Sequence, residues 1–282
     1  MTMPALVRTV SSYYAKSGRH HLPWRQTQNP YRILVSEVML QQTQVYRVLP
    51  KYKLFVKKFP TVQALAEAPL SEVLLAWSGL GYNRRAKYLQ QAAKVVAEKY
   101  NRTFPQDVKR LEELPGVGHY TARAVAIFAF NKPEVCIETN IRTVFLHHCF
   151  ADASAGEIAD ATLFPLIEQA LRVAHRQGIE SRHFYAALMD YGTHLKASGV
   201  KLNAQSKHYI KQKKFAGSTR QLRGAIVRAL LAGPATVKQI KDFCARAQKS
   251  ILYTEVKIEH ELLRLQKEGL VIRRGRQFAL AG

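Results

Sequence analysis

Two glutamates stand where a carboxyl group can do chemistry, and the first is Glu37. Residues 33–45 read ILVSEVMLQQTQV, and on a helix Ile33 and Leu40 lie on the same side as Glu37. Burying a charge is costly, so this carboxyl group either finds a partner or keeps its proton through a raised pKa. A glutamic acid that stays protonated near neutral pH is a candidate general acid. The alternative is a boundary residue whose side chain bends out to water.

The second carboxyl group, Glu138, precedes a predicted helix in CIETNIRTVFLHHC, residues 136–149. We expect Thr139 to be the N-cap of this helix, whose dipole and free N–H groups favour a negative charge on Glu138. Cleavage through an oxocarbenium-like state needs such a pair, an acid for the leaving group and an anion beneath the sugar. By itself, Glu138 also fits an ordinary carboxylate at a helix terminus.

A third motif, LPGVGHYT at residues 114–121, connects two predicted helices. Its glycines permit a tight turn and a close approach to a ligand, and the N-terminus of the following helix can then face a phosphate. We interpret it as a helix–hairpin–helix, which grips a nucleic-acid backbone without reading its sequence. The residues expected to contact DNA there are Gly116, Val117, Gly118, His119 and Thr121. The alternative is a plain connection between helices.

The charge of the chain favours a polyanionic partner. Lys and Arg number 43 against 20 Asp and Glu, a formal charge of +23 in 282 residues, which points most simply to nucleic acid. A membrane surface is the alternative, but no apolar run approaches the ~20 residues that a bilayer requires. We expect no membrane partner, and a monomer by default.

Cysteine usage and the N-terminal segment bear on the compartment. Cys136, Cys149 and Cys244 lack metal-ligand spacing, and their odd, sparse count fits a reducing compartment. The first 36 residues contain no Asp or Glu, which faintly resembles a transit peptide. An ordinary amphipathic helix explains the segment as well, and we expect a cytoplasmic protein, associated with the nucleoid through DNA.

Helical periodicity with short breaks predicts an all-α first domain. The predicted helices lie near residues 4–17, 31–49, 51–58, 61–67, 70–76, 83–100, 107–113, 119–130, 140–150, 157–175 and 181–190. A polar, basic connector follows.

The C-terminal part has a different pattern. Helices are predicted in TRQLRGAIVRALLAG (219–233), TVKQIKDFCARA (236–247, capped by Thr236) and TEVKIEHELLRLQKEGL (254–270, also Thr-capped). Two short strands then flank Arg274-Gly275. This layout is typical of a small winged helix-turn-helix, which binds DNA or, alternatively, another protein.

Three stretches together resemble the MutY family of adenine DNA glycosylases: LPWRQTQNPYRILVSEVMLQQTQV, WSGLGYNRRAKYL and LPGVGHYTARA. The resemblance covers roughly residues 20–195. It implies a two-lobed helix–hairpin–helix DNA glycosylase fold (GPD superfamily) with the active site between the lobes, and base flipping in base excision repair of damaged DNA. We predict a glycosylase domain at 1–198 (six-helix lobe about 28–133, second lobe 1–27 plus 134–198), the connector at 199–217 and the winged helix at 218–282.

The resemblance also implies roles for individual residues. Glu37 would protonate the flipped base, and Glu138 and Asn140 would face the sugar. Tyr120 stands where enzymes resembling endonuclease III have a catalytic lysine, so strand cleavage (AP lyase activity) should be weak or absent. The residues implied to border the base pocket are Trp24, Arg25, Leu40, Tyr185 and Ala186. Those implied to contact DNA are Gln42, Thr43, Val45, Tyr82 and Arg84, with Gln42 and Tyr82 entering the duplex.

The chain departs from the family pattern at four points. Glu138 replaces the family's aspartate. Residues 190–215 contain no cysteine, so no iron–sulfur cluster is expected. Tyr185 and Ala186 replace Asn and Gln or Glu, which puts the base in question. A winged helix stands where the family has its 8-oxoguanine-recognition domain. The resemblance also implies that the hairpin carbonyls of Leu114 and Val117 hold a monovalent cation; no other metal is expected.

These observations predict a monofunctional glycosylase that hydrolyses the N-glycosidic bond of a mispaired base in double-stranded DNA. Adenine opposite 8-oxoguanine or guanine is the first expectation. One alternative is release of thymine, uracil or an oxidised pyrimidine. Another is a non-catalytic DNA-binding protein.

Overall fold

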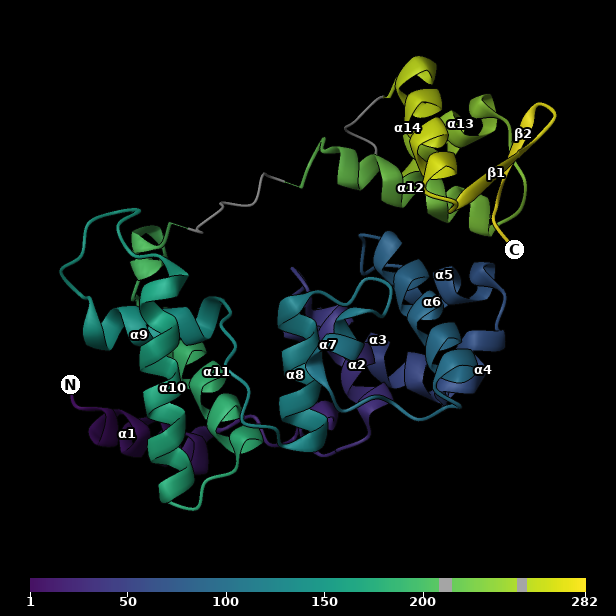
Figure 1. Cartoon of the computed structure of the whole chain (residues 1–282). Coiled ribbons are helices and arrows are strands. Elements are labelled where there is room, and N and C mark those ends of the chain that lie inside the picture. Colours follow the sequence, from purple (N-terminus) through teal and green to yellow (C-terminus); the bar gives the residue numbers. More distant parts are fainter. Residues whose placement is uncertain (208–214, 248–252) are drawn as a thin grey trace. The chain divides into compact units, whose positions relative to one another are not determined.

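The computed structural model of the chain describes residues 1–207, 215–247 and 253–282 (Figure 1). Helices make up nearly all of its regular structure, and the strands lie in one C-terminal hairpin, so the predicted all-α class with a small winged helix is confirmed. Residues 208–214 of the predicted connector lie outside the described residues. No helix in the described ranges is long and apolar enough to cross a membrane.

The chain forms two compact units, and the first comprises residues 1–37, 104–113 and 117–211. Its helices are α1 (Met3–Ser17), α7 (Val108–Glu112), α8 (His119–Phe130), α9 (Thr139–Cys149), α10 (Asp160–Arg176) and α11 (Ser181–Ala197), with short 3-10 turns at Pro23–Arg25 and Leu202–Gln205. The N-terminal helix α1 packs against α10 and α11, far away in the sequence (Figure 1). Phe145, Phe184 and Tyr185 are fully buried in the core these helices share.

The helix α2 (Pro30–Leu40) carries Glu37 and is buried along most of its length. The predicted single helix over 31–49 is wrong: α2 ends at Leu40, and four residues separate it from α3 (Val45–Lys58). Gln42 adopts a φ of 53°, which a right-handed helix cannot accommodate. The helix α3 instead continues through Pro50, where the prediction placed a break.

The second unit comprises residues 38–103, 114–116 and 212–282. Its first part contains α3, α4 (Val62–Glu67), α5 (Leu70–Trp77) and α6 (Arg84–Lys99). Trp77 and Phe55 are fully buried and meet edge to face, with ring centroids 5.9 Å apart. Trp77 Nε1 also donates to the Gly81 carbonyl at 3.1 Å, which ties the segment 78–83, between α5 and α6, to this core.

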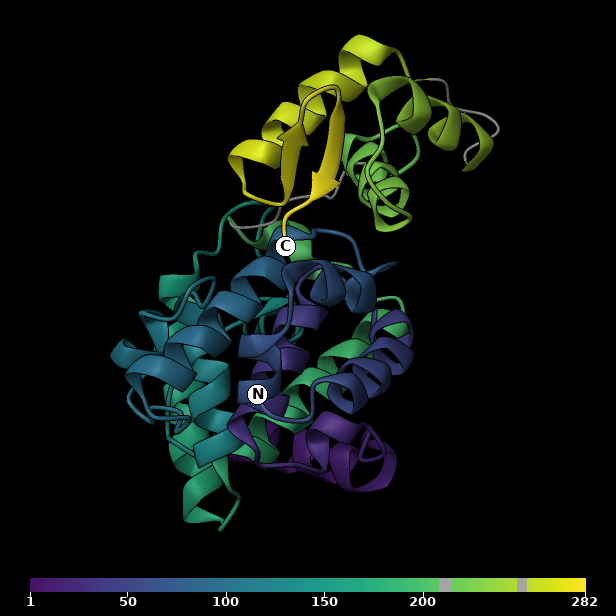
Figure 2. The ribbon, with the colours of Figure 1, turned by 90° about the vertical axis from the view of Figure 1, so that its right-hand side faces the viewer.

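The C-terminal part of the second unit has the predicted winged-helix elements (Figure 2). They are α12 (Thr219–Leu231), α13 (Val237–Ala247), α14 (Glu255–Lys267) and the antiparallel strands β1 (Val271–Arg274) and β2 (Gln277–Leu280). Ala235 forms an isolated antiparallel β-bridge with Phe278 of β2. The predicted caps are confirmed, because Thr236 Oγ1 and Thr254 Oγ1 each accept a backbone N–H at 3.3 Å.

In the first unit, two helix boundaries differ from the predictions by three residues or more. The helix α10 begins at Asp160, not 157, where the Asp160 carboxylate binds the Arg142 guanidinium at 2.8 Å through both oxygens. The helix α11 runs to Ala197, not 190. That extension brings Thr193 and Lys196 onto the helix that carries Asp190. The predicted domain boundaries stay a prediction.

Candidate active site

Glu37 lies inside the first unit with its side chain almost fully withdrawn from water. The residue is 9% exposed, and burial is the main reason that its pKa rises from the ordinary 4.5 to about 7. The Arg25 charge opposes this rise, the Glu138 charge adds to it, and a hydrogen bond from Tyr120 opposes it. The protonated carboxyl group expected from the apolar sequence context therefore persists up to about pH 7.

Tyr120, in the first turn of α8, is the hydroxyl partner of Glu37. Burial raises the pKa of the Tyr120 hydroxyl well above 10, and the Glu37 charge raises it further. Tyr120 thus stays a neutral hydrogen-bond donor. It cannot form a Schiff base, because it has no amine.

Glu138 is itself the N-cap of α9, so the expected Thr139 cap is wrong. One oxygen, Oε1, accepts the N–H of Asn140 at 2.8 Å and that of Ile141 at 3.0 Å. The longer glutamate side chain folds back onto the helix terminus and takes the place of a shorter cap residue. The N-terminal dipole favours a negative charge there.

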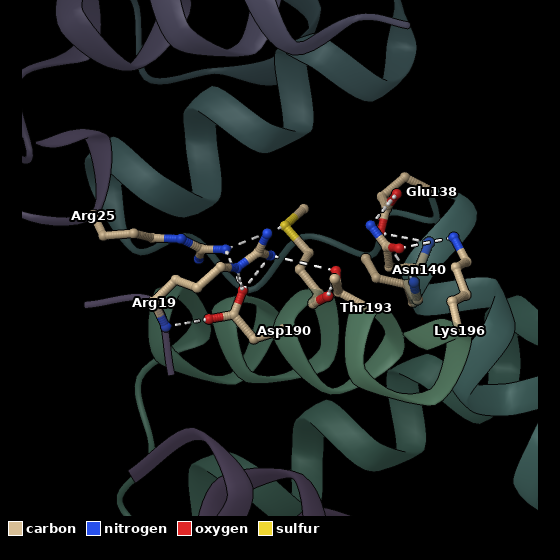
Figure 3. Close-up of polar contacts among 9 residues, drawn as sticks. Arg19, Arg25, Glu138, Asn140, Asp190, Thr193 and Lys196 are labelled. Carbon is tan, nitrogen blue, oxygen red and sulfur yellow. Dashed lines mark hydrogen bonds and ion pairs between the residues drawn. The ribbon is translucent and has the colours of Figure 1, made fainter. Parts of the chain in front are cut away.

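Asn140 holds the second oxygen of Glu138. Its side-chain Nδ2 donates to Glu138 Oε2 at 3.2 Å, and its Oδ1 accepts from Lys196 Nζ at 2.8 Å (Figure 3). Lys196 belongs to α11, so this chain of hydrogen bonds to the Glu138 carboxylate joins side chains of two helices, α9 and α11. The sequence alone did not single out Lys196.

Arg25 is positioned by a buried carboxylate. Asp190, with a side chain 2% exposed, accepts Arg19 N at 2.7 Å and Arg19 Nε at 2.8 Å, and its Oδ1 lies 3.6 Å from Arg25 Nη2 (Figure 3). The Arg25 guanidinium also lies over the Phe128 ring, 5.2 Å from its centroid. Its Nε and Nη1 are buried and have no hydrogen-bond partner among the residues that the structure describes.

Those two Arg25 nitrogens call for an acceptor, because buried donors in folded proteins are normally paired. A group carried by a ligand is one such acceptor.

Trp24, expected to border the same pocket, is buried beside Arg25 in the chain. Leu40, at the end of α2, is half-buried.

Tyr185 and Ala186, the altered positions of the expected base pocket, are both buried. The Tyr185 hydroxyl donates to the Glu134 carbonyl at 2.9 Å and accepts the Cys136 N–H at 3.3 Å. This side chain ties α11 to the segment before Glu138. Tyr185 therefore has a structural role that the sequence did not reveal.

The hairpin before α8 turns tightly at Gly116. Gly116 has a φ of +75°, and a Cβ there would lie 2.5 Å from Tyr88 Cβ. Gly118 is the N-cap of α8 and has no side chain to accept hydrogen bonds from the first-turn N–H groups. The oxygens of a phosphate could accept these hydrogen bonds instead. His119 is exposed, whereas Val117 and Thr121 are buried.

In the second unit, Gln42 and Tyr82 occupy two exposed loops with strained backbones. Their φ values are 53° and 48°, a region that L-residues rarely adopt and that often marks functional segments. Thr43 and Val45 are half-buried beside Gln42, and Arg84 donates to the Tyr88 hydroxyl at 2.7 Å.

Arg85, which the sequence analysis did not single out, joins these two loops. Its Nη1 donates to the carbonyls of Val38 at 2.7 Å and Gln41 at 2.6 Å, and its Nη2 donates to Thr43 Oγ1 at 3.1 Å. Nη2 also donates to the Gly81 carbonyl at 3.2 Å, beside Tyr82. Burial lowers the pKa of Arg85 to about 10. The only earlier signal was its position three residues after Tyr82 in WSGLGYNRRAKYL.

The predicted residues thus fall into two sets. The first unit brings together Glu37, Tyr120, Glu138, Asn140 and Arg25, whose charges and hydrogen bonds act on one another. The second unit holds the loops of Gln42 and Tyr82. Within the described ranges, no group of three His, Cys, Asp or Glu side chains is arranged to hold a metal ion.

Comparison with known proteins shows which family part of this chain resembles. Residues 35–165 match the model of HhH-GPD superfamily base excision DNA repair proteins. An adenine DNA glycosylase of Buchnera aphidicola (subsp. Baizongia pistaciae) is 34% identical over 76% of this chain and 61% of its own length. One of Mycobacterium tuberculosis is 46% identical over 51% of this chain and 48% of its own. The chain therefore spans about three fifths of the first of these relatives and about half of the second.

Solved structures share the fold. A thermostable thymine-DNA glycosylase aligns with a TM-score of 0.59 at 26% identity, over 73% of this chain and 96% of that one. An endonuclease III in a trapped DNA complex aligns with a TM-score of 0.51 at 20% identity, over 78% of this chain and 95% of that one. By this partial family match and these relatives, the chain is similar to HhH-GPD superfamily base excision DNA repair proteins and to adenine DNA glycosylases.

Proposed function

We propose that this chain is a monofunctional DNA glycosylase that removes a mispaired base from duplex DNA, with adenine opposite 8-oxoguanine or guanine as the first substrate. The observation that carries the proposal is the pair of carboxyl groups in opposite environments. Glu37 is buried with a pKa of about 7, and Glu138 caps the N-terminus of α9. The curated relatives, which are adenine DNA glycosylases, support the choice of base.

In the proposed reaction, protonated Glu37 gives its proton to the departing base, and Tyr120 keeps the acid oriented. Glu138 stabilises the positive charge that develops on the sugar as the N-glycosidic bond lengthens. Water then adds at the anomeric carbon, loses a proton and leaves an abasic site. The unpaired donors of Arg25 offer hydrogen bonds to the flipped base.

Binding to double-stranded DNA is the second part of the proposal. The charge of +23 supplies the sequence-independent attraction, and the hairpin of Gly116 and Gly118 takes a backbone phosphate. Gln42 and Tyr82 enter the duplex at the mismatch, and their loops keep a fixed shape through Arg85. Affinity for DNA should fall steeply with salt.

The finer parts of the proposal concern strand cleavage, cofactors and the oligomeric state. We propose little or no strand cleavage, since Tyr120 stands in place of a catalytic lysine. We also propose activity without an iron–sulfur cluster, because residues 190–215 contain no cysteine. The hairpin carbonyls of Leu114 and Val117 are the proposed ligands of a monovalent cation. A monomer that acts on DNA in the cytoplasm is the proposed working state.

The test is base release from labelled duplexes that carry adenine opposite 8-oxoguanine or guanine, followed by hot alkali to reveal abasic sites. The wild type should produce alkali-sensitive breaks, and Glu37→Gln, which keeps the shape but cannot give up a proton, should produce none. Glu168→Gln, an exposed change on α10 in the first unit, serves as the matched control. Tight binding without base release from any duplex would support the non-catalytic alternative instead.

Release of thymine or uracil opposite guanine is the second candidate. The observation that favours it is the buried Tyr185-Ala186 pair, which provides neither the amide nor the carboxylate expected for adenine. The fold similarity to a thymine-DNA glycosylase agrees with it. The same assay on thymine and uracil mismatches decides between the two candidates.

A further inference from the structure

Glu138 is an uncommon choice for the position it occupies. Helix N-caps favour Ser, Thr, Asp and Asn, whose short side chains reach the first-turn N–H groups directly. A glutamate must fold back on itself to do so, and it gives up more side-chain freedom. The bonds from Asn140 N and Ile141 N hold only Oε1. The direction of the other oxygen depends on the Asn140 side chain.

The Asn140 amide is oriented in turn by Lys196. An amine can only donate to the side-chain oxygen, so the Lys196 Nζ to Asn140 Oδ1 bond of 2.8 Å fixes which end of the amide is the oxygen. The Nδ2 end is then turned toward Glu138 Oε2, at 3.2 Å. Figure 3 shows the three side chains in a row, with Asn140 between Lys196 and Glu138.

The packing of α11 on α9 brings Lys196 into this row. Gly192 lies one turn before Lys196 on the same face of α11, and it faces the backbone of Asn140 so closely that a Cβ there would overlap the Asn140 carbonyl. The side chain of Lys196 is half-buried, and burial lowers its pKa, while the Glu138 charge acts in the opposite direction. A half-buried lysine loses part of its hydration, which is unfavourable unless another interaction compensates for it.

We propose that Lys196 is a positioning residue for the proposed glycosylase reaction: through Asn140 it holds the Glu138 carboxylate in the orientation that faces the developing cation on the sugar. The neutral amide between the two has a physical advantage. A lysine in direct contact with Glu138 would neutralise the charge that the sugar cation needs. With Asn140 between them, Lys196 orients the carboxylate and leaves its charge available. This inference rests on the proposed function and deepens it.

The experiment measures binding of two duplexes that replace one nucleotide by a baseless ring. One ring is a protonated pyrrolidine, which mimics the sugar cation, and the other is a neutral tetrahydrofuran of the same size. The ratio of the two dissociation constants reports how well the site stabilises a cation. The ratio does not depend on which base the enzyme releases. The variants are Lys196→Met and Lys196→Arg, with Lys201→Met, an exposed lysine nearby, as the matched control.

Lys196→Met should lower the preference for the cationic ring, and the single-turnover rate of base release, by about 10- to 100-fold. Binding of the neutral ring should change little. Lys196→Arg should restore most of the preference, and Lys201→Met should match the wild type. In the double variant with Glu138→Gln, Lys196→Met should cause no further loss, because both changes act through one carboxylate.

The opposite result has a clear meaning. If Lys196 acted only as a nearby positive charge, its removal would strengthen binding of the cationic ring. A stronger or unchanged preference in Lys196→Met therefore overturns the inference. Lys196→Gln, polar but too short to reach Asn140, repeats the comparison should the methionine variant fold poorly. A wild type that prefers neither ring and releases no base would instead refute the proposed function.

Discussion

Replacing Glu37 by Gln should stabilise the protein at pH 8 but not at pH 4. In the folded chain the pKa of Glu37 is about 7, against an ordinary 4.5. The folded state therefore binds a proton that the unfolded state releases above pH 4.5. Stability contributed by the protonated form is fully present below pH 4.5 and is lost as the pH rises through 7. Gln keeps the size and the hydrogen bonding of the protonated acid and has no proton to lose.

The magnitude follows from the two pKa values. At about 1.4 kcal/mol per pH unit, they correspond to about 3 kcal/mol between pH 4 and pH 8, to order of magnitude. Urea unfolding of wild type and Glu37→Gln at both pH values gives the difference directly, because other titrating groups are common to both proteins and cancel. Glu259→Gln, at an exposed glutamate, controls for the loss of a charge.

Parallel pH dependences for wild type and Glu37→Gln would refute the argument. They would mean that Glu37 titrates alike in the folded and unfolded states, so that burial does not keep its proton. A buried general acid with a pKa near 7 would then be excluded.

Three further predictions concern the pH dependence and the loops. The single-turnover rate of base release should fall above about pH 7, as Glu37 loses its proton, and a pH–rate profile measures this; a flat profile to pH 9 would contradict the assignment. Arg85→Lys should lower the free energy of unfolding by about 2 to 4 kcal/mol, because one ammonium group cannot donate hydrogen bonds to the carbonyls of both loops. Urea unfolding measures this loss, and an unchanged midpoint would contradict the prediction. Gly116→Ala should destabilise the hairpin by more than about 1 kcal/mol and weaken DNA binding in an anisotropy titration, whereas Gly282→Ala at the exposed C-terminus should do neither.

The sequence by itself determined most of the helices and strands and indicated the type of chemistry that we propose. Periodicity placed most helices within a few residues, since an apolar stripe every three to four residues must face a core. The caps Thr236 and Thr254 were predicted correctly from local cues, whereas at α9 the cap is Glu138 and not the expected Thr139. The apolar neighbours of Glu37 already indicated a raised pKa, because they are local on one helix.

Only the tertiary structure decided how those residues are held. Lys196 reaches Asn140 across 56 positions of sequence, and Asp190 reaches Arg19 across 171, so no local pattern announces either contact. The helix break at Gln42 was missed for the same reason, because the loop is held by Arg85, 44 positions beyond Gln41. The resemblance implied that Tyr185 borders the base pocket, yet its hydroxyl donates to the Glu134 carbonyl, 51 positions away in the sequence. Local sequence sets helical propensity and burial, whereas the orientation of a buried polar group depends on partners that only the folded chain brings near.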